Sequence, residues 1–225
     1  MLTPTHTFRQ HGIGRPDPPL DDTGSTRHHA AASDGAARPA AMTPQEPPSG
    51  PTGSPHTHLV VLRGPSGAGK TTVATAVRAR LGHGVALVQQ DVLRRVVLRE
   101  HDVPGGLNIA LIATVCRFSL DAGYHVILEG ILTAARYGPM LRRLAADHRG
   151  HTTFFYFDVP FAETVRRHAT RPQAEEFTAE DMHGWYAASG RLDAPGEQII
   201  DTTSSTKASV DRIVAYVARN EPDAS

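Results

Sequence analysis

One segment of the chain combines the residue types that bind a phosphate group. It fits the pattern G-x-x-x-x-G-K-[ST] at every fixed position and reads Gly64, Pro65, Ser66, Gly67, Ala68, Gly69, Lys70, Thr71, followed by Thr72. In such a loop the glycines let backbone N–H groups turn toward the β-phosphate of a nucleotide. Lys70 then reaches the β- and γ-oxygens, and the Thr71 hydroxyl ligates magnesium. The spacing therefore predicts a site for a nucleoside triphosphate with Mg²⁺ over residues 64–72.

The residues on both sides of this segment have the local structure that the loop requires. Residues 59–62 form a short apolar run, as in a strand buried on both faces of a parallel sheet. From Thr72 onward, apolar residues recur with helical spacing. The loop therefore opens onto a helix N-terminus, whose partial positive charge favours phosphate. A motif that lies between a strand and a helix is far more specific than the motif alone.

Two carboxylates follow later strands of the expected sheet. Asp91 closes the second strand (residues 85–88), where it can hydrogen-bond an acceptor hydroxyl and take its proton. Its alternative role is the N-cap of a helix over residues 92–100. Glu129 follows the third strand, where it can hold the magnesium shell or position the acceptor. Its alternative role is to pair with a nearby arginine.

A group of arginines follows the fourth expected strand (residues 152–157): Arg166, Arg167 and Arg171. A guanidinium that closes over the transferring phosphoryl group stabilises charge in the transition state, and a movable lid excludes water. The alternative is a solvated helix face. We expect at least one of the three to contact phosphate, with Arg167 or Arg171 ahead of Arg166.

Residues 1–57 differ in composition from the rest of the chain. They hold ten of the 17 prolines and almost no large aliphatic residues. Such a stretch buries too little apolar surface to offset the entropy of ordering it, so we expect a disordered tail. Residues 58–225 alternate strand and helix, which predicts one α/β domain with a parallel sheet, its fifth strand at residues 198–200.

The charge balance and the cysteine content limit the class of protein. Lys+Arg and Asp+Glu number 23 each, which disfavours nucleic acid and anionic membranes as partners. Cys116 is the single cysteine, so no intramolecular disulfide can form. No apolar run approaches the roughly 18 residues of a membrane span, and the N-terminus lacks the apolar core of a secretory signal. We therefore expect a cytoplasmic protein.

In this order of parts the sequence resembles the P-loop small-molecule and nucleotide kinases, in particular the AAA-type ATP-binding group of chloramphenicol phosphotransferase and the zeta toxins. The resemblance covers roughly residues 58–218 and rests on the phosphate loop, Asp91, Glu129 and the arginine group. It implies an α/β three-layer sandwich, with a five-stranded parallel sheet flanked by helices and an arginine-bearing lid. It also implies Mg²⁺-ATP as the phosphoryl donor, but it implies no particular acceptor.

We therefore expect an ATP-dependent kinase that transfers the γ-phosphate to a hydroxyl of a small molecule, such as an antibiotic, a nucleoside or a metabolite. Its expected catalytic residues are Lys70, Asp91, Arg167 and Arg171. Two alternatives stay open: a zeta-toxin-like kinase of nucleotide sugars, and a regulatory protein that binds ATP without transferring phosphate. Asp91 together with an arginine lid argues against the regulatory protein, because a switch needs no base for a hydroxyl. Arg94, Arg95, Arg136 and Tyr137 flank the two carboxylates and are candidates for the acceptor pocket.

Overall fold

The computed structural model describes residues 46–169 and 194–219, together with residues 178, 180, 182, 183, 186 and 190–192. Arg171 and residues 1–45 lie outside the described residues, so the lid role of Arg171 and the disorder of the tail stay predictions.

Five parallel strands form one sheet in the order β2-β3-β1-β4-β5. The strands are β1 (His58–Arg63), β2 (Val85–Gln89), β3 (His125–Gly130), β4 (His151–Asp158) and β5 (Gln198–Asp201). Each contains one of the five runs that the sequence predicted as strands. The expected parallel sheet is therefore confirmed, and its order places β1, which precedes the phosphate loop, in the middle.

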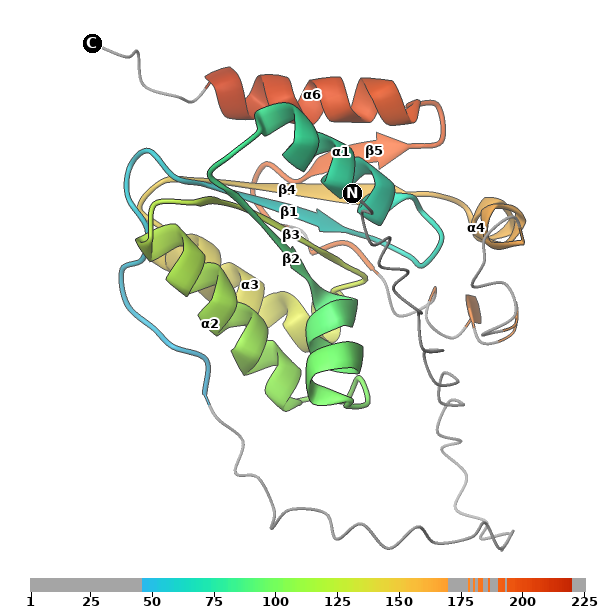
Figure 1. The fold of residues 1–225 in the computed structure, drawn as a ribbon. Coiled ribbons are helices and arrows are strands. Elements are labelled where there is room, and N and C mark those ends of the chain that lie inside the picture. The colour runs from blue at the N-terminus through green and yellow to red at the C-terminus, as the bar shows by residue number, and fades with distance from the viewer. Residues whose placement is uncertain are drawn as a thin grey trace, which may run out of the picture.

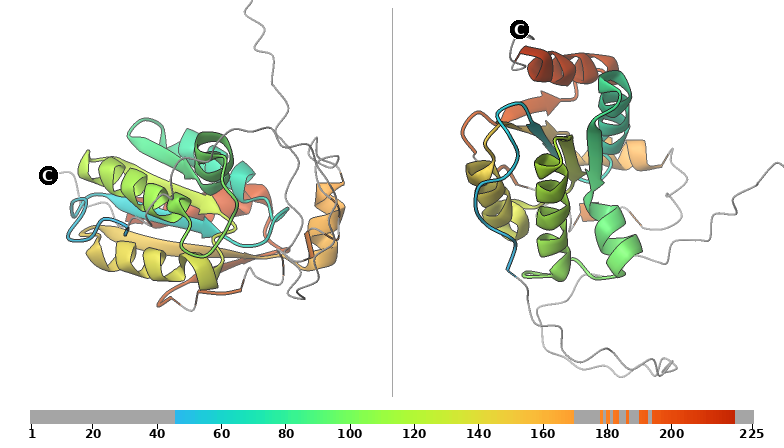
Figure 2. Two further views of the ribbon diagram at one scale, coloured as in Figure 1. Left: turned by 90° about the horizontal axis from the view of Figure 1, so that it is seen from below. Right: turned by 60° about the vertical axis from the view of Figure 1, so that its left-hand side comes forward.

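Helices cover both faces of this sheet (Figures 1 and 2). α1 (Lys70–Leu81) and α6 (Thr206–Arg219) lie on one face, while α2 (Leu107–Asp121) and α3 (Ala134–Asp147) lie on the other. α4 (Phe161–His168) lies beyond the end of the sheet to which the strands point. The three-layer α/β sandwich expected from the sequence is thus confirmed. Within the described ranges, no helix is both long enough and apolar enough to cross a bilayer.

The central strand β1 contributes alternate side chains to two separate cores. Leu59 and Val61 pack with residues of α2 and α3. Val60 and Leu62 pack with residues of α1 and α6. All four are at most 3% exposed. Burial on both faces explains why this strand is a continuous apolar run instead of an alternating one.

Residues 50–57, here called the N-terminal strap, pack against the domain, although the sequence analysis placed them in the tail. The hydroxyl of Thr52 donates to Asp121 Oδ1 at 2.9 Å, and the Gly53 amide donates to the same oxygen at 2.7 Å. Arg149 Nε donates to the Gly53 carbonyl at 2.7 Å. The folded domain therefore begins before the expected boundary at His58, because polar and backbone hydrogen bonds hold the strap where apolar burial does not.

Candidate active site

The phosphate loop lies between β1 and α1, and two of its glycines are required by its backbone. Gly64 and Gly67 have φ values of 140° and 79°, which side chains other than hydrogen rarely tolerate. A Cβ on Gly64 would lie 2.7 Å from the Phe157 carbonyl oxygen, and one on Gly67 would lie 2.8 Å from that of Thr164. The loop is thus pressed against β4 and α4, and no larger residue fits at either position.

Lys70 begins α1 and folds back over the loop. Its Nζ donates to the Pro65 carbonyl at 2.7 Å, and the residue is only 6% exposed. The ammonium therefore lies within the loop, close to the positive end of α1. Two positive features meet at one point, which is the arrangement that binds a polyphosphate.

The hydroxyl of Thr71 lies against the carboxylate of Glu129. Thr71 Oγ1 donates to Glu129 Oε1 at 3.0 Å, and Gln89 Nε2 donates to the same oxygen at 2.9 Å. Glu129 is 5% exposed and lies opposite Gln89 in the pairing of β2 with β3. The structure therefore brings Glu129 to the phosphate loop, and its contacts here are a hydroxyl and an amide instead of the arginine considered above.

A hydroxyl and a carboxylate are oxygen ligands of the kind that Mg²⁺ prefers. Among the described residues, no group of three or more His, Cys, Asp or Glu side chains could hold a metal ion. Mg²⁺ commonly takes one or two protein ligands and completes its shell with phosphate and water oxygens. Thr71 and Glu129 fit such a site.

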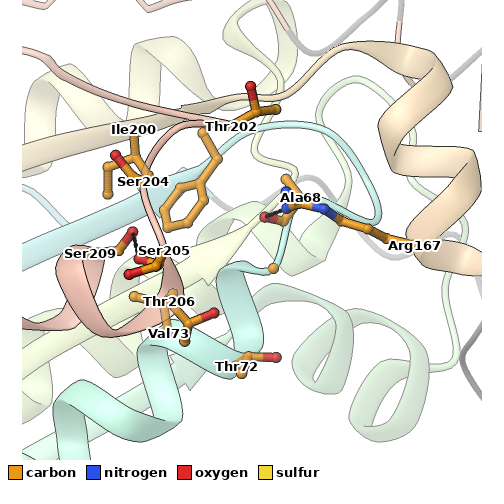
Figure 3. A pocket seen from close by; sticks show the side chains of 12 residues that line it. Ala68, Thr72, Val73, Arg167, Ile200, Thr202, Ser204, Ser205, Thr206 and Ser209 are labelled. Atoms are coloured by element: carbon orange, nitrogen blue, oxygen red, sulfur yellow. Dashed lines mark hydrogen bonds between the residues drawn. The ribbon is translucent and has the colours of Figure 1, made fainter.

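Of the expected lid arginines, Arg167 reaches the phosphate loop and Arg166 does not. Arg167 Nη1 donates to the Ala68 carbonyl at 3.2 Å (Figure 3), while its Nε donates to Glu163 at 2.7 Å. Arg166 also pairs with Glu163, but its side chain is 71% exposed. Hydrogen bonds from Arg166 and then Arg167 lower the pKa of the Glu163 carboxyl to about 2. Glu163 therefore stays ionised and orients Arg167.

A cavity of about 420 Å³ opens beside the loop (Figure 3). Its walls come from the phosphate loop, α1, α4, the ends of β4 and β5, the start of α6 and the connection between β5 and α6. The lining includes Ala68, Gly69, Thr72, Val73, Phe157, Arg167, Ile200, Thr202, Ser204, Ser205, Thr206 and Ser209. Sequence reasoning missed the connection after β5. The sequence signal that could have identified this connection is a run of threonine and serine at the carboxyl end of a parallel strand, where ligands bind in open α/β sheets.

Asp91 follows the carboxyl end of β2 (Val85–Gln89) by two residues. Its side chain is 60% exposed, and Oδ1 lies 3.3 Å from Arg94 Nη2. The expected helix after it is a π-helix, η1 (Val92–Leu98), and Asp91 makes no side-chain hydrogen bond as its N-cap. Of the two roles considered for Asp91, the N-cap is therefore not supported. The base role stays a prediction.

Tyr137, a candidate for the acceptor pocket, is fully buried. Its hydroxyl donates to Asp102 Oδ1 at 2.6 Å and accepts from Gln90 Nε2 at 2.8 Å and Asn108 Nδ2 at 2.7 Å. Burial, followed by the Asp102 charge, raises the pKa of the Tyr137 phenol above its ordinary value. The phenol therefore stays protonated. It joins the end of β2 to the starts of α2 and α3, which is a structural role.

Comparison with known proteins agrees with this architecture. A sequence family described as an AAA domain matches residues 59–195, while no curated protein matches the sequence. Similar solved structures include an APS kinase from Mycobacterium tuberculosis in complex with AMPPNP and APS. It is 21% identical, covers 75% of this chain and 99% of its own, and has a TM-score of 0.56.

Two further solved structures are similar. A sugar kinase from Janibacter sp. HTCC2649 is 19% identical, covers 73% of this chain and 95% of its own, and has a TM-score of 0.58. A gluconokinase from Sinorhizobium meliloti 1021 is 16% identical, covers 75% of this chain and 95% of its own, and has a TM-score of 0.56. At these identities the likeness establishes the fold, which is that of the P-loop kinases.

Proposed function

The chain belongs to the AAA domain family, and we propose that it is a Mg²⁺-ATP-dependent phosphotransferase that acts on a hydroxyl of a small molecule. One observation carries the proposal: the Lys70 ammonium, the Thr71–Glu129 pair and the Arg167 guanidinium meet at a single loop. Together they supply the charges that a transferring phosphoryl group requires. The similar solved structures named above are all kinases, which supports the reaction class.

Each group at the loop has a part in the proposed reaction. The N–H groups of residues 64–72 bind the β-phosphate, and Lys70 binds the β- and γ-oxygens. Thr71 and Glu129 would hold Mg²⁺, which neutralises charge on the phosphates when bound. Arg167 donates to the equatorial oxygens of the transferring group. Because these donors are fixed before substrate binds, they stabilise the transition state with little reorganisation.

We assign the cavity beside the loop to the nucleoside part of the donor. Its volume of about 420 Å³ lies within the range of small-molecule sites, and hydroxyls and backbone of the β5–α6 connection supply polar groups. The sequence lacks an N/T-K-x-D element for reading guanine, which favours ATP over GTP.

The acceptor hydroxyl would attack the γ-phosphorus in line with the leaving group. The new bond forms between the acceptor oxygen and phosphorus, the bond from phosphorus to the β–γ bridging oxygen breaks, and ADP leaves. We propose that Asp91 takes the proton of the acceptor hydroxyl. Its exposure, at the carboxyl end of β2, supports a role toward a substrate that enters from solvent.

A screen of small-molecule hydroxyl acceptors with γ-labelled Mg²⁺-ATP tests the proposal, with the Lys70→Ala variant as the blank. Antibiotics, nucleosides, sugars and nucleotide sugars form the acceptor classes. We expect one class to raise phosphate transfer well above the blank. Transfer to nucleotide sugars, together with growth arrest of cells that express the chain, would identify the zeta-toxin-like alternative. If ATP binds and no acceptor is phosphorylated, the kinase proposal fails and a regulatory ATP-binding protein replaces it.

A further inference from the structure

Arg63, the residue directly before the phosphate loop, carries a charge in the interior of the protein. It ends β1 and has no exposed surface. Its Nη1 donates to Glu197 Oε1 at 2.9 Å, and its Nη2 donates to the Gly190 carbonyl at 2.9 Å. Nε and Nη2 donate to the Leu132 carbonyl at 3.3 and 3.0 Å. One guanidinium at the end of β1 thus contacts the connection after β3 and two residues that precede β5.

Buried ion pairs are not a general requirement of folding. Removing a guanidinium and a carboxylate from water costs free energy that their attraction often fails to recover, and apolar side chains of similar size are frequently as stable. The arginine fork differs from an apolar side chain because it fixes the direction of several acceptors at once. The arginine therefore indicates a site where the relative positions of the acceptor segments matter.

The acceptors of Arg63 belong to the segments that form the candidate site. Leu132 follows Glu129 by three residues and has a φ of 46°, an uncommon conformation for a buried leucine. The backbone there directs its carbonyl to Arg63. Nearby, the Gly64 amide donates to the Ile131 carbonyl at 3.4 Å. The start of the phosphate loop is thus tied to the connection that follows Glu129.

Glu197 ties the same guanidinium to the chain before β5. Its side chain is 6% exposed, and its second oxygen accepts from the Leu192 amide at 3.2 Å. Leu192 is buried in the core beneath α3. Glu197 directly precedes β5 (Gln198–Asp201), and the connection after β5 lines the cavity beside the loop.

We propose that Arg63 is a positioning residue, and that its ion pair with Glu197 sets the phosphate loop relative to the Glu129 strand and the cavity beside the loop. Arg63 would act on nucleotide affinity without touching the nucleotide. This inference rests on the proposed function, because it assumes that the loop binds Mg²⁺-ATP.

Calorimetric titration with Mg²⁺-ATP, beside thermal unfolding of each protein, tests the inference. Glu197→Gln removes the charge of the carboxylate and keeps the size of the side chain. Arg63→Lys keeps the positive charge and removes the planar guanidinium with its several donors. We expect each to weaken Mg²⁺-ATP binding about tenfold at a temperature where the protein is folded. Glu197→Asp, which keeps the carboxylate, should bind within about threefold of wild type.

The neighbouring ion pair of Arg191 with Asp158 supplies a matched control. Arg191 Nη2 lies 2.8 Å from Asp158 Oδ2, and the two side chains are 51% and 44% exposed. Asp158→Asn therefore removes a nearby ion pair in which Arg63 takes no part. We expect Asp158→Asn to bind Mg²⁺-ATP within about twofold of wild type.

Three outcomes would overturn the inference, and they differ from one another. If the Glu197→Gln and Arg63→Lys proteins fold and bind Mg²⁺-ATP with wild-type affinity, the ion pair has only a structural role. Failure of both variants to fold would show that the pair is required for folding itself. Wild-type protein that does not bind Mg²⁺-ATP would overturn the proposed function, and this inference with it.

Discussion

The contact of Arg167 with the Ala68 carbonyl distinguishes two arginines that are adjacent in the sequence. Both pair with Glu163, yet only Arg167 reaches the phosphate loop. Arg167→Ala should lower kcat/KM for phosphoryl transfer about 100-fold, because a fixed donor to the developing charge is lost. Arg166→Ala, which disturbs the same carboxylate, should stay within about threefold of wild type. Steady-state kinetics of both variants would test this, and equal losses would refute the placement of Arg167.

At Asp91 the prediction separates nucleotide binding from transfer. Asp91→Asn keeps the size of the side chain but cannot take a proton from the acceptor hydroxyl. Since the side chain is exposed and lies at the end of β2, Mg²⁺-ATP affinity should stay within about twofold, while transfer should fall by at least about 100-fold. Titration calorimetry and single-turnover transfer measure the two quantities. Near-normal turnover would remove Asp91 as the base.

At the scale of elements, apolar runs predicted the five strands, because strands buried on both faces of a parallel sheet need continuous apolar runs. The sequence also located the phosphate loop and Glu129, whose contacts follow from strand order. It missed the N-terminal strap and the lining of the cavity by the β5–α6 connection. The strap is a polar segment held through hydrogen bonds between residues remote in sequence, such as Thr52 with Asp121, and no local pattern encodes such partners. The β5–α6 connection makes local hydrogen bonds, from Thr203 and Ser204 to Asp201, and its place in the cavity wall depends on the tertiary arrangement.

The strap leads to a prediction about truncation. Thr52 and Gly53 donate to Asp121, and these bonds, chiefly that from the Gly53 amide, lower the pKa of the Asp121 carboxyl. Thr57 Oγ1 lies 2.9 Å from His148 Nε2. A chain that begins at Glu46 keeps these contacts, and one that begins at His58 loses all of them. We expect the shorter chain to lose about 2–4 kcal/mol, a fall in Tm of roughly 5–10 °C, which calorimetry would detect.

The control for this truncation is the Thr52→Ala variant in the full chain. It removes one hydroxyl that donates to Asp121 and should lower the free energy of unfolding by about 1 kcal/mol. Equal Tm values for the chains that begin at Glu46 and at His58 would show that the strap contributes nothing to stability.

At the scale of the whole molecule, the two ends of the sheet differ in chemistry. The phosphate loop and Glu129 lie at the carboxyl ends of the strands. At the amino ends, β1, β3 and β4 begin with His58, His125 and His151. The ring centroid of His58 lies 5.0 Å from that of His125 and 5.2 Å from that of His151. His58 Nε2 is buried and has no hydrogen-bond partner among the described residues.

These histidines should make the fold sensitive to mild acid. Burial, followed by the charges of His125, His151 and His148, lowers the pKa of His58 from 6.5 to about 4. Burial, followed by the His151 charge, also lowers that of His148 to about 4. Between about pH 6.5 and 4 the unfolded chain therefore binds protons that the folded protein excludes. Stability is full above pH 6.5 and falls as the pH decreases through this window, with an upper limit of about 3 kcal/mol per histidine.

Urea unfolding at pH 7.5, 6 and 5 measures this fall before most carboxylates titrate, because their ordinary pKa values lie near 4. His58→Phe keeps a ring between its two neighbours and removes the titrating group. We expect this variant to lose less stability than wild type between pH 7.5 and 5. His83→Gln, at an exposed turn position, should keep the wild-type pH dependence, because this variant leaves His58 and His148 in place. A free energy of unfolding that is equal at pH 7.5 and 5 in wild type would contradict the assignment. Because the histidines lie opposite the phosphate loop, acid should act on the stability of the fold before it acts on the nucleotide site.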